Sequence, residues 1–240
     1  MPVALITGAS QGLGRAVAGE LAARRWTLVV DARSGADLET LRSSLPAADI
    51  HAIAGDVTDE AHRAALVQQV DALGGLDLLV NNASMLGPSP QPELARYPLD
   101  VLRRVYETDV IAPLALVQAL LPALKSGRGA ILNISSDAAV EAYEGWGGYG
   151  SAKAALDQAT AVLAVEQPDL DVYAFDPGDM QTQMHQAAFP GEDISDRPEP
   201  STVVPAVMRL VDERPASGRY RAAALLADLP REALTNAGPA

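Results

Sequence analysis

The sequence predicts an α/β domain in which a doubly wound parallel sheet carries helices on both faces. Three observations support this class. The 240 residues are 48% hydrophobic, which is enough to bury one large core. Short, β-branched apolar runs alternate with longer helical patterns, as in βαβ units. No linker, low-complexity tract or internal repeat divides the chain, so residues 1–240 are expected to form a single domain.

The apolar runs predict strands and the Ala- and Leu-rich segments between them predict helices. Strands are expected at 3–7, 27–32, 50–55, 76–82, 129–135, 171–176 and, as a seventh, near 219–225. Helices are expected at about 12–24, 36–45, 59–72, 100–124 and 149–167. Two irregular stretches, 84–98 and 179–200, each follow a strand, so both should lie at the sheet edge where ligands bind. The second is expected to be a mobile substrate loop.

Composition excludes several classes of function. The net charge is −13 without a basic cluster, which argues against nucleic acid and anionic membranes as partners. There is no cysteine, and His51, His62 and His185 are scattered, so we expect no metal site. The N-terminus enters an apolar strand at once, and no apolar run approaches the roughly 18–20 residues of a membrane span. The expected location is the cytoplasm.

A glycine-rich turn, TGASQGLG at residues 7–14, joins the first strand to the first helix. Gly8, Gly12 and Gly14 allow a tight turn and a close approach to a pyrophosphate, which the helix N-terminus would attract. Such a turn alone can be purely structural. Because the strand before it and the helix after it are both present, we interpret it as a dinucleotide site.

Further motifs follow in a definite order: GDVTD at 55–59, NNAS at 81–84, ILNISS at 131–136, YGSAK at 149–153 and DPGDMQT at 176–182. Together with the glycine-rich turn, they resemble the short-chain dehydrogenase/reductase family over about residues 3–182. The resemblance implies a Rossmann-like fold and a reaction in which a hydride passes between a nicotinamide cofactor and a carbonyl or secondary alcohol.

The resemblance also implies which residues hold the cofactor. Asp56 and Val57 would contact the adenine, although Asp56 could instead cap the next helix. Asn81 would tie the central strands together and lie beside the cofactor with its neighbours. Pro177, Gly178 and Thr182 would cover the nicotinamide. The full expected set is Gly8, Ser10, Gln11, Gly12, Leu13, Gly14, Arg33, Asp56, Val57, Asn82, Ala83, Tyr149, Lys153, Pro177, Gly178 and Thr182.

The end of the second strand decides the choice of cofactor. A carboxylate there would accept from the ribose 2′-hydroxyl of NAD, whereas a cation would bind the 2′-phosphate of NADP. The family's acidic position falls on Ala32, and Arg33 follows, which favours NADP. Asp31 keeps NAD open as an alternative, because a register error of one residue would bring its carboxylate to the ribose. Alternation along a strand allows only one of Asp31 and Ala32 to serve.

Ser136, Tyr149 and Lys153 are the candidate catalytic residues. Tyr149 and Lys153 are four residues apart, so they share a helix face. A phenol has a pKa near 10, and we expect the ammonium of Lys153 to lower the pKa of Tyr149 so that it acts as general acid–base. Ser136 would polarise the substrate oxygen. The structural alternatives are a loop hydroxyl at Ser136, with Ser135 as competitor, and an exposed Tyr–Lys pair.

Two residues depart from the family pattern. Ser84 stands where glycine is usual, and Asp109 stands where asparagine usually holds a water that links the lysine to solvent. Aspartate can accept from the same water but cannot donate to it. We therefore count Asp109 with the candidate catalytic residues and expect catalysis with an altered pH dependence. The alternative is an ordinary surface aspartate.

The sequence thus predicts an oxidoreductase that acts with NADP, or NAD, on a small carbonyl or alcohol substrate. Two alternatives stay open: an epimerase or dehydratase acting on nucleotide sugars, and a dinucleotide-binding regulatory or scaffold protein without turnover. The helices at 100–124 and 149–167 are apolar on more than one face. They are therefore expected to pair copies of the chain into a homodimer or homotetramer.

Overall fold

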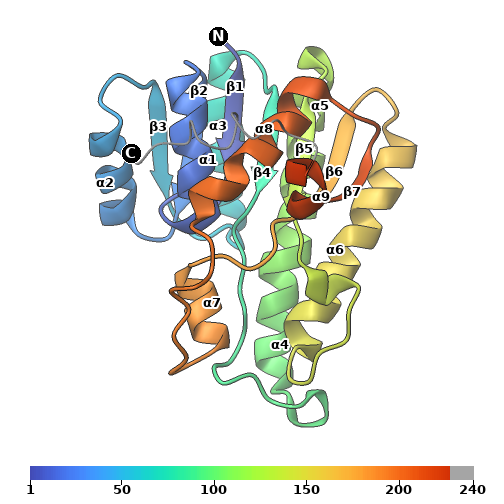
Figure 1. Cartoon of the computed structure of the whole chain (residues 1–240). Coiled ribbons are helices and arrows are strands. Elements are labelled where there is room, and N and C mark those ends of the chain that lie inside the picture. Colours follow the sequence, from blue (N-terminus) through green and yellow to red (C-terminus); the bar gives the residue numbers. More distant parts are fainter. Residues whose placement is uncertain (228–240) are drawn as a thin grey trace.

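The computed structural model describes residues 1–227 and contains a seven-stranded parallel sheet (Figure 1). Its strand order is β3-β2-β1-β4-β5-β6-β7. The strands are added in one direction from β1 to β3 and in the other from β4 to β7, so the switch point lies between β1 and β4. The predicted fold class is therefore confirmed. The strands are β1 (Val3–Ile6), β2 (Thr27–Ala32), β3 (Ile50–Ala54), β4 (Leu78–Asn81), β5 (Ala130–Ile134), β6 (Asp171–Asp176) and β7 (Gly218–Arg221). The predicted single domain also included residues 228–240, which lie outside the described residues.

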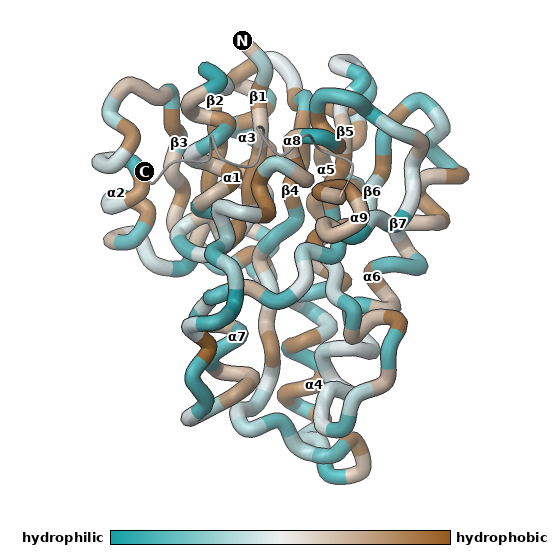
Figure 2. Tube along the Cα trace, viewed as in Figure 1, coloured by the Kyte–Doolittle hydropathy of each residue, from teal (hydrophilic) through white to brown (hydrophobic). Residues whose placement is uncertain are grey.

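Helices cover both faces of the sheet and form two separate cores. One face packs against α1 (Gly12–Ala23), α2 (Gly35–Ser44), α8 (Val204–Glu213) and α9 (Ala222–Ala227). The other packs against α3 (Glu60–Leu73) and α5 (Ala112–Gly127), with part of α6 (Gly147–Glu166). The inner strands are mostly apolar and almost entirely buried, because helices cover both of their faces; Figure 2 shows much of them in brown. The two edge strands, β3 and β7, are only partly buried.

The predicted helix at 100–124 is a longer run that changes its winding near the middle. It consists of α4 (Leu99–Tyr106), a π-helical turn (Glu107–Ile111) and α5. Among the described residues, Leu99–Gly127 is the one helical run long and apolar enough to cross a membrane by length and composition. From the sequence, no apolar run long enough to span a membrane was expected. That expectation considered runs of apolar residues, and it is wrong when the length and mean hydropathy of the whole helical run are used instead. Leu116, Leu120 and Leu124 of this run pack into the sheet's second core.

Three helices were missed from the sequence. The stretch 179–200, expected to be irregular, contains α7 (Gln183–Ala188). The seventh strand ends at Arg221, and the following residues Ala222–Ala227 form α9, because four alanines and two leucines favour a helix once pairing with β6 ends. Helix α8 has apolar residues at helical spacing, Val204, Val207, Met208 and Val211, a pattern that could have predicted it.

All seven strands run in the same direction, so their carboxyl ends lie at one edge of the sheet. In Figure 1 this is the lower edge of the sheet, above α7 and the start of α4. Both stretches that follow β4 and β6 lie at this edge. The topology therefore brings the glycine-rich turn, the end of β5 and the start of α6 to the same side of the molecule.

Candidate active site

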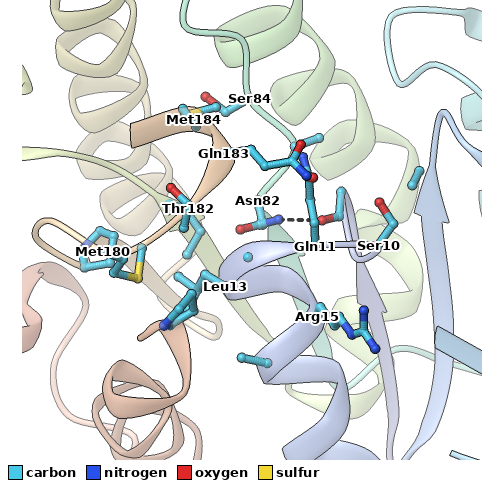
Figure 3. Close-up of a pocket in the computed structure, with 18 of the residues that line it drawn as sticks. Ser10, Gln11, Leu13, Arg15, Asn82, Ser84, Met180, Thr182, Gln183 and Met184 are labelled. Atoms are coloured by element: carbon cyan, nitrogen blue, oxygen red, sulfur yellow. Dashed lines mark hydrogen bonds between the residues drawn. The ribbon is translucent and has the colours of Figure 1, made fainter. Parts of the chain in front are cut away.

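A large open cleft runs along the carboxyl edge of the sheet, with a volume of about 2370 Å³. This is more than one small ligand needs, because the cleft continues from the sheet edge along α1 and α8. Figure 3 shows Ser10 and Gln11 of the glycine-rich turn in it, with Met180 and Thr182 from the segment after β6 also lining it. We call the part of the cleft near β1, β2 and β3 the nucleotide end. The part near β5, β6 and the start of α6 is the chemical end.

The glycine-rich turn has the geometry of an anion cradle. Gly8 and Gly12 have φ angles of +64° and +55°, which favour glycine. A Cβ atom at Gly14 would lie 2.6 Å from the carbonyl oxygen of Gly8, so helix α1 can approach the turn only without a side chain there. No side chain caps the N-terminus of α1, and its first turn holds no acidic residue. The backbone N–H groups of the first turn of α1 are therefore suited to bind a pyrophosphate.

Asp31 is a structural residue of the nucleotide end. Its Oδ1 accepts from the backbone N–H of Gly8 at 2.8 Å, and its Oδ2 lies 2.9 Å from Nε2 of His62. The residue is only 1% exposed. Both carboxylate oxygens are therefore engaged beneath the turn, and Asp31 is not presented as a ribose acceptor. Ala32 and the exposed Arg33 line the cleft beside it.

Asp56 and Val57 also line the nucleotide end. Asp56 Oδ1 accepts from the backbone N–H and the hydroxyl of Thr58, at 2.9 and 2.8 Å. These hydrogen bonds, with the charge of Arg33 adding to them, hold the pKa of Asp56 below its usual value. Asp56 does not cap the next helix, since α3 begins at Glu60 and its cap is Asp59. The carboxylate of Asp56 is therefore ionised near Arg33.

The three residues after β4 have different roles. Asn81 is buried within the sheet and donates to Oδ1 of Asn133 on β5 at 2.8 Å, so it ties the central strands together as expected. Its side chain does not line the cleft, contrary to the expectation that it lies beside the cofactor. Asn82 and Ala83 do line it. The amide of Asn82 donates to the carbonyl oxygens of Thr7 and Gly8, which fixes the glycine-rich turn to β4.

Pro177, Gly178 and Thr182 cross the cleft from the end of β6. Thr182 accepts from the N–H of His185 and so caps α7. A Cβ atom at Gly12 would lie 3.5 Å from Cγ2 of Thr182, which shows how closely this segment approaches the glycine-rich turn. The predicted cofactor residues from the two ends of the sequence therefore face one another across the cleft.

Tyr149 lies at the chemical end, near the start of α6, and is 7% exposed. The glycines on either side of it explain its position. A Cβ atom at Gly148 would lie 2.3 Å from the ring of Tyr97, and one at Gly150 would lie 2.6 Å from the carbonyl oxygen of Ala138. Glycine at 148 therefore lets α6 approach the segment that follows β4, and glycine at 150 lets it press against the loop after β5, which carries Ser136.

Lys153 follows one turn later on α6 and is 2% exposed. Its Nζ donates to the carbonyl oxygen of Ile134 at 2.9 Å and lies 5.4 Å from the centre of the Tyr149 ring. The structural alternative of an exposed Tyr–Lys surface pair is thus wrong. So is the expected lowering of the tyrosine pKa: burial raises the pKa of Tyr149 well above its usual value, and the charge of Asp109 raises it further.

Asp109 lies in the π-helical turn and is fully buried, so it is not a surface aspartate. Its Oδ1 accepts from the N–H of Met85 at 2.7 Å, and its Oδ2 accepts from the hydroxyl of Ser84 at 2.9 Å. Oδ2 also lies 3.7 Å from Nζ of Lys153. Burial raises the pKa of Asp109, while the charge of Lys153 opposes that rise. The two residues that depart from the family pattern, Ser84 and Asp109, are therefore hydrogen-bonded to each other.

Ser136 caps a short 3₁₀ turn and lines the cleft. Its hydroxyl lies 3.0 Å from Oδ1 of Asp137, to which it donates, and it accepts from the N–H of Ala138. The competing residue, Ser135, also lines the cleft but is only 2% exposed, and its hydroxyl has no hydrogen-bond partner among the described residues. Ser136 is thus the more accessible of the two hydroxyls.

Arg219 on β7 links three parts of the chemical end and was missed from the sequence. Its guanidinium donates to Asp157 Oδ2 at 2.8 Å, to the carbonyl oxygen of Ser136 at 2.8 Å and to Asp176 Oδ2 at 3.2 Å. Asp157 stands four residues after Lys153, on the same face of α6. An arginine on an edge strand carries no comparable signal, because edge residues are commonly charged.

The wall of the chemical end is aromatic and apolar. The ring of Trp146 lies edge-on to Tyr149, with centroids 5.9 Å apart, and 5.9 Å from Phe189. Leu86 and Met184 pack in the same cluster. Helix α7 therefore covers Tyr149, and the segment predicted as a substrate loop forms one side of the site.

Comparison with known proteins agrees with this geometry. The family model for short chain dehydrogenase matches residues 2–193. Serine 3-dehydrogenase of Rhizobium radiobacter is 34% identical over 183 residues, 75% of this chain and 72% of that protein. Sepiapterin reductase of Rattus norvegicus is 33% identical over 201 residues, 78% and 77% of the two chains.

Solved structures show the same fold. A short chain dehydrogenase of Shigella flexneri 2a, complexed with NADP, superposes with a TM-score of 0.85 at 27% identity, covering 92% of this chain and 97% of that one. The family model covers most of the sequence, and both enzymes above exceed 30% identity over most of their length. The chain therefore belongs to the short-chain dehydrogenase/reductase family and is an oxidoreductase with a Rossmann-like fold.

Proposed function

We propose that the protein interconverts a carbonyl compound and a secondary alcohol with NADP(H), with Tyr149 as general acid–base. The observation that carries this proposal is the placement of Tyr149. It is buried at the chemical end of the cleft, one turn before Lys153, and it lines the same cleft as the glycine-rich turn and Ser136. A phenol in this position can reach a substrate oxygen while the cofactor lies along the sheet edge.

NADP is favoured by the nucleotide end. Asp31 is committed to Gly8 and His62, so no carboxylate of β2 is free to accept from a ribose hydroxyl. Arg33 is exposed at the cleft and can pair with a 2′-phosphate. The related structure from Shigella flexneri 2a holds NADP. NAD is the alternative cofactor.

The roles of the residues follow from their contacts. The bound cofactor supplies or accepts the hydride at the carbonyl carbon. Burial raises the pKa of Tyr149, so the phenol keeps its proton near neutral pH and can donate it to the oxygen that gains charge during reduction. Ser136 holds that oxygen by a hydrogen bond once its hydroxyl turns from Asp137. Lys153, fixed by Ile134, supplies a positive charge beside the phenol.

We also propose that copies of the chain pair through their helices. Ile111, Val162 and Val165 are 46%, 42% and 81% exposed, so apolar side chains of two helical segments are open to solvent. Val162 and Val165 line a shallow groove on α6 with Gln158, Ala161 and Glu166. A second copy would bury this apolar surface and give the homodimer or homotetramer that the sequence predicts. Sedimentation of wild type and Val165→Glu tests this, since the charged variant should dissociate.

The test of the reaction is a spectrophotometric assay of NADPH and NADH oxidation with a panel of ketones and aldehydes. Tyr149→Phe should lower kcat by roughly 10²- to 10⁴-fold, the usual contribution of a general acid. Tyr220→Phe, whose hydroxyl bonds to Ala216 away from the cleft, is the matched control and should retain activity. Cofactor binding measured by fluorescence verifies that both variants are folded. Undiminished turnover by Tyr149→Phe would rule out the mechanism.

A further inference from the structure

Asp31 and His62 form a buried pair beneath the glycine-rich turn. Oδ2 of Asp31 lies 2.9 Å from Nε2 of His62, and the two side chains are only 1% and 6% exposed. Oδ1 of Asp31 accepts from the N–H of Gly8 at 2.8 Å. The pair therefore connects α3, which carries His62, to the first glycine of the turn. The steps of the proposed reaction use neither residue.

The chain provides a seat for the imidazole. A Cβ atom at Gly55 would overlap Nδ1 of His62, so the ring packs directly on the backbone that follows β3. His62 stands in the first turn of α3, whose start is fixed by the cap at Asp59. The carbonyl oxygen of Asp31 also accepts from the N–H of Ala9 at 2.8 Å. Asp31 thus holds two successive residues of the glycine-rich turn, and His62 holds Asp31.

The charge of this pair acts on the turn. A buried carboxylate is costly unless a cation pairs with it, and His62 supplies that positive charge when its imidazole is protonated. The same charge reaches the neighbouring Asp56: after the hydrogen bonds from Thr58, the charges of Arg33 and His62 lower the pKa of Asp56. Without the charge of His62, the carboxylate of Asp31 would stand uncompensated behind Gly8. It would then repel an anion bound at the turn.

We propose that His62 is a positioning residue for the dinucleotide: it holds Asp31 on Gly8 and neutralises that carboxylate, so that the glycine-rich turn can accept a pyrophosphate. This inference rests on the proposed use of NADP(H). Because NADP and NAD share the pyrophosphate, His62 should affect both cofactors alike. Arg33, in contrast, is proposed to act on the 2′-phosphate, which only NADP carries.

The experiment measures the Kd of NADPH and of NADH by fluorescence titration, at about pH 6.5, where an imidazole can carry its charge. Glutamine keeps a hydrogen-bond donor but cannot be charged. His62→Gln should therefore weaken both cofactors by about tenfold, because it leaves the carboxylate of Asp31 without its counter-charge. In the Asp31→Asn background, the same change at His62 should cost about twofold or less, because no carboxylate remains to be neutralised.

His51→Gln is the matched control. His51 also faces an aspartate, with its Nε2 3.3 Å from Oδ1 of Asp49, but this pair is partly exposed and does not line the cleft. Both Kd values of His51→Gln should match wild type. Unfolding in urea verifies that each variant is folded during the titration. A purely structural contact at His62 would weaken binding by the same factor with Asp31 present or replaced.

Three results would overturn the proposal: unchanged Kd values in His62→Gln, a loss confined to NADPH, or equal losses with Asp31 present and replaced. The readout is binding and does not depend on turnover. Absence of carbonyl reduction with intact cofactor binding would refute the proposed reaction alone, so the two failures are distinguishable.

Discussion

The two ends of the cleft are held by groups of opposite charge. At the nucleotide end, the carboxylate of Asp31 accepts from Gly8 and contacts His62, so an acid is surrounded by nitrogen groups. At the chemical end, the guanidinium of Arg219 donates to Asp157, Asp176 and Ser136, so a cation is surrounded by oxygen atoms. Both centres link segments far apart in sequence.

This difference separates the carboxylates that hold the protein frame together from those that contact groups of the active site. Asp31 and Asp157 are engaged by fixed partners on the protein frame. Asp109 and Asp137 instead contact Ser84 and Ser136, the hydroxyls of the site. Together with Asp176, these two charges raise the pKa of Tyr149. The comparison therefore predicts that changes at Asp31 and Arg219 affect stability first, whereas a change at Asp109 affects the pH dependence of the reaction.

The largest effect on stability is expected from Arg219→Ala. It leaves Asp176, which is 2% exposed, and Asp157 without their main partner. The free energy of unfolding in urea should fall by about 3 kcal/mol, the loss typical of breaking a buried ion pair. Arg221→Ala is the control, because Arg221 is 59% exposed and lies 3.6 Å from the same carboxylate. Equal losses in the two variants would contradict the central role of Arg219.

A smaller loss is expected from Asp31→Asn. The amide keeps the shape but loses the charge that faces His62 and Gly8, so the free energy of unfolding should fall by about 2 kcal/mol. The pH dependence of kcat should not change, because Asp31 belongs to the nucleotide end. Asp212→Asn, which alters a surface pair with Arg24, is the control and should cost under about 1 kcal/mol. A shifted pH profile in Asp31→Asn would break the comparison.

Arg33→Ala tests whether the nucleotide end selects NADPH over NADH. If Arg33 pairs with the 2′-phosphate, its loss should weaken NADPH binding by about tenfold or more, the value of a charged hydrogen bond. Binding of NADH should change little, and fluorescence titration measures both. Arg25→Ala, outside the cleft, serves as control. Equal weakening for the two cofactors would show that Arg33 does not discriminate between them.

The smallest effect is expected from Asp109→Asn, which should shift the pH dependence of the reaction rate. The charge of Asp109 raises the pKa of Tyr149, so the neutral amide should lower that pKa. Reduction needs the protonated phenol, and its rate falls as the pH rises through the pKa of Tyr149. In Asp109→Asn, the rate of reduction should therefore begin to fall at a pH that is lower than in wild type by about one unit or less. A profile of kcat/KM against pH that matches wild type would contradict this.

The sequence predicted the fold because most of its strands are short, mainly apolar runs. All seven strands and five of the helices were predicted within a few residues. The glycines at 8 and 12 correctly predicted a tight turn, since both adopt positive φ angles that favour glycine. Helix α7 was missed because six residues after a threonine cap give too short a pattern. The end of β7 was misplaced because the apolar residues after Arg221 were counted with the strand, although alanine favours a helix.

The contacts of the site were less predictable. Ser84 and Asp109 each departed from the family pattern, but nothing in their spacing showed that they meet. The π-helical turn orients Asp109, and a helical period of 3.6 residues does not reveal it. The expected lowering of the pKa of Tyr149 considered Lys153 alone, whereas burial and three carboxylates act in the opposite direction. Side-chain environment depends on the packing of several segments, and a single motif does not contain it.

The position of Arg219 has a consequence for the order in which the chain is made. Every catalytic candidate, from Asp109 to Lys153, precedes β7 in the chain and is therefore synthesised before it. The loop after β5, helix α6 and the end of β6 are joined only when Arg219 arrives and reaches Ser136, Asp157 and Asp176. A nascent chain that stops before Gly218 therefore carries all the catalytic candidates without the contacts of Arg219 that join their segments, and activity should appear only once β7 is made.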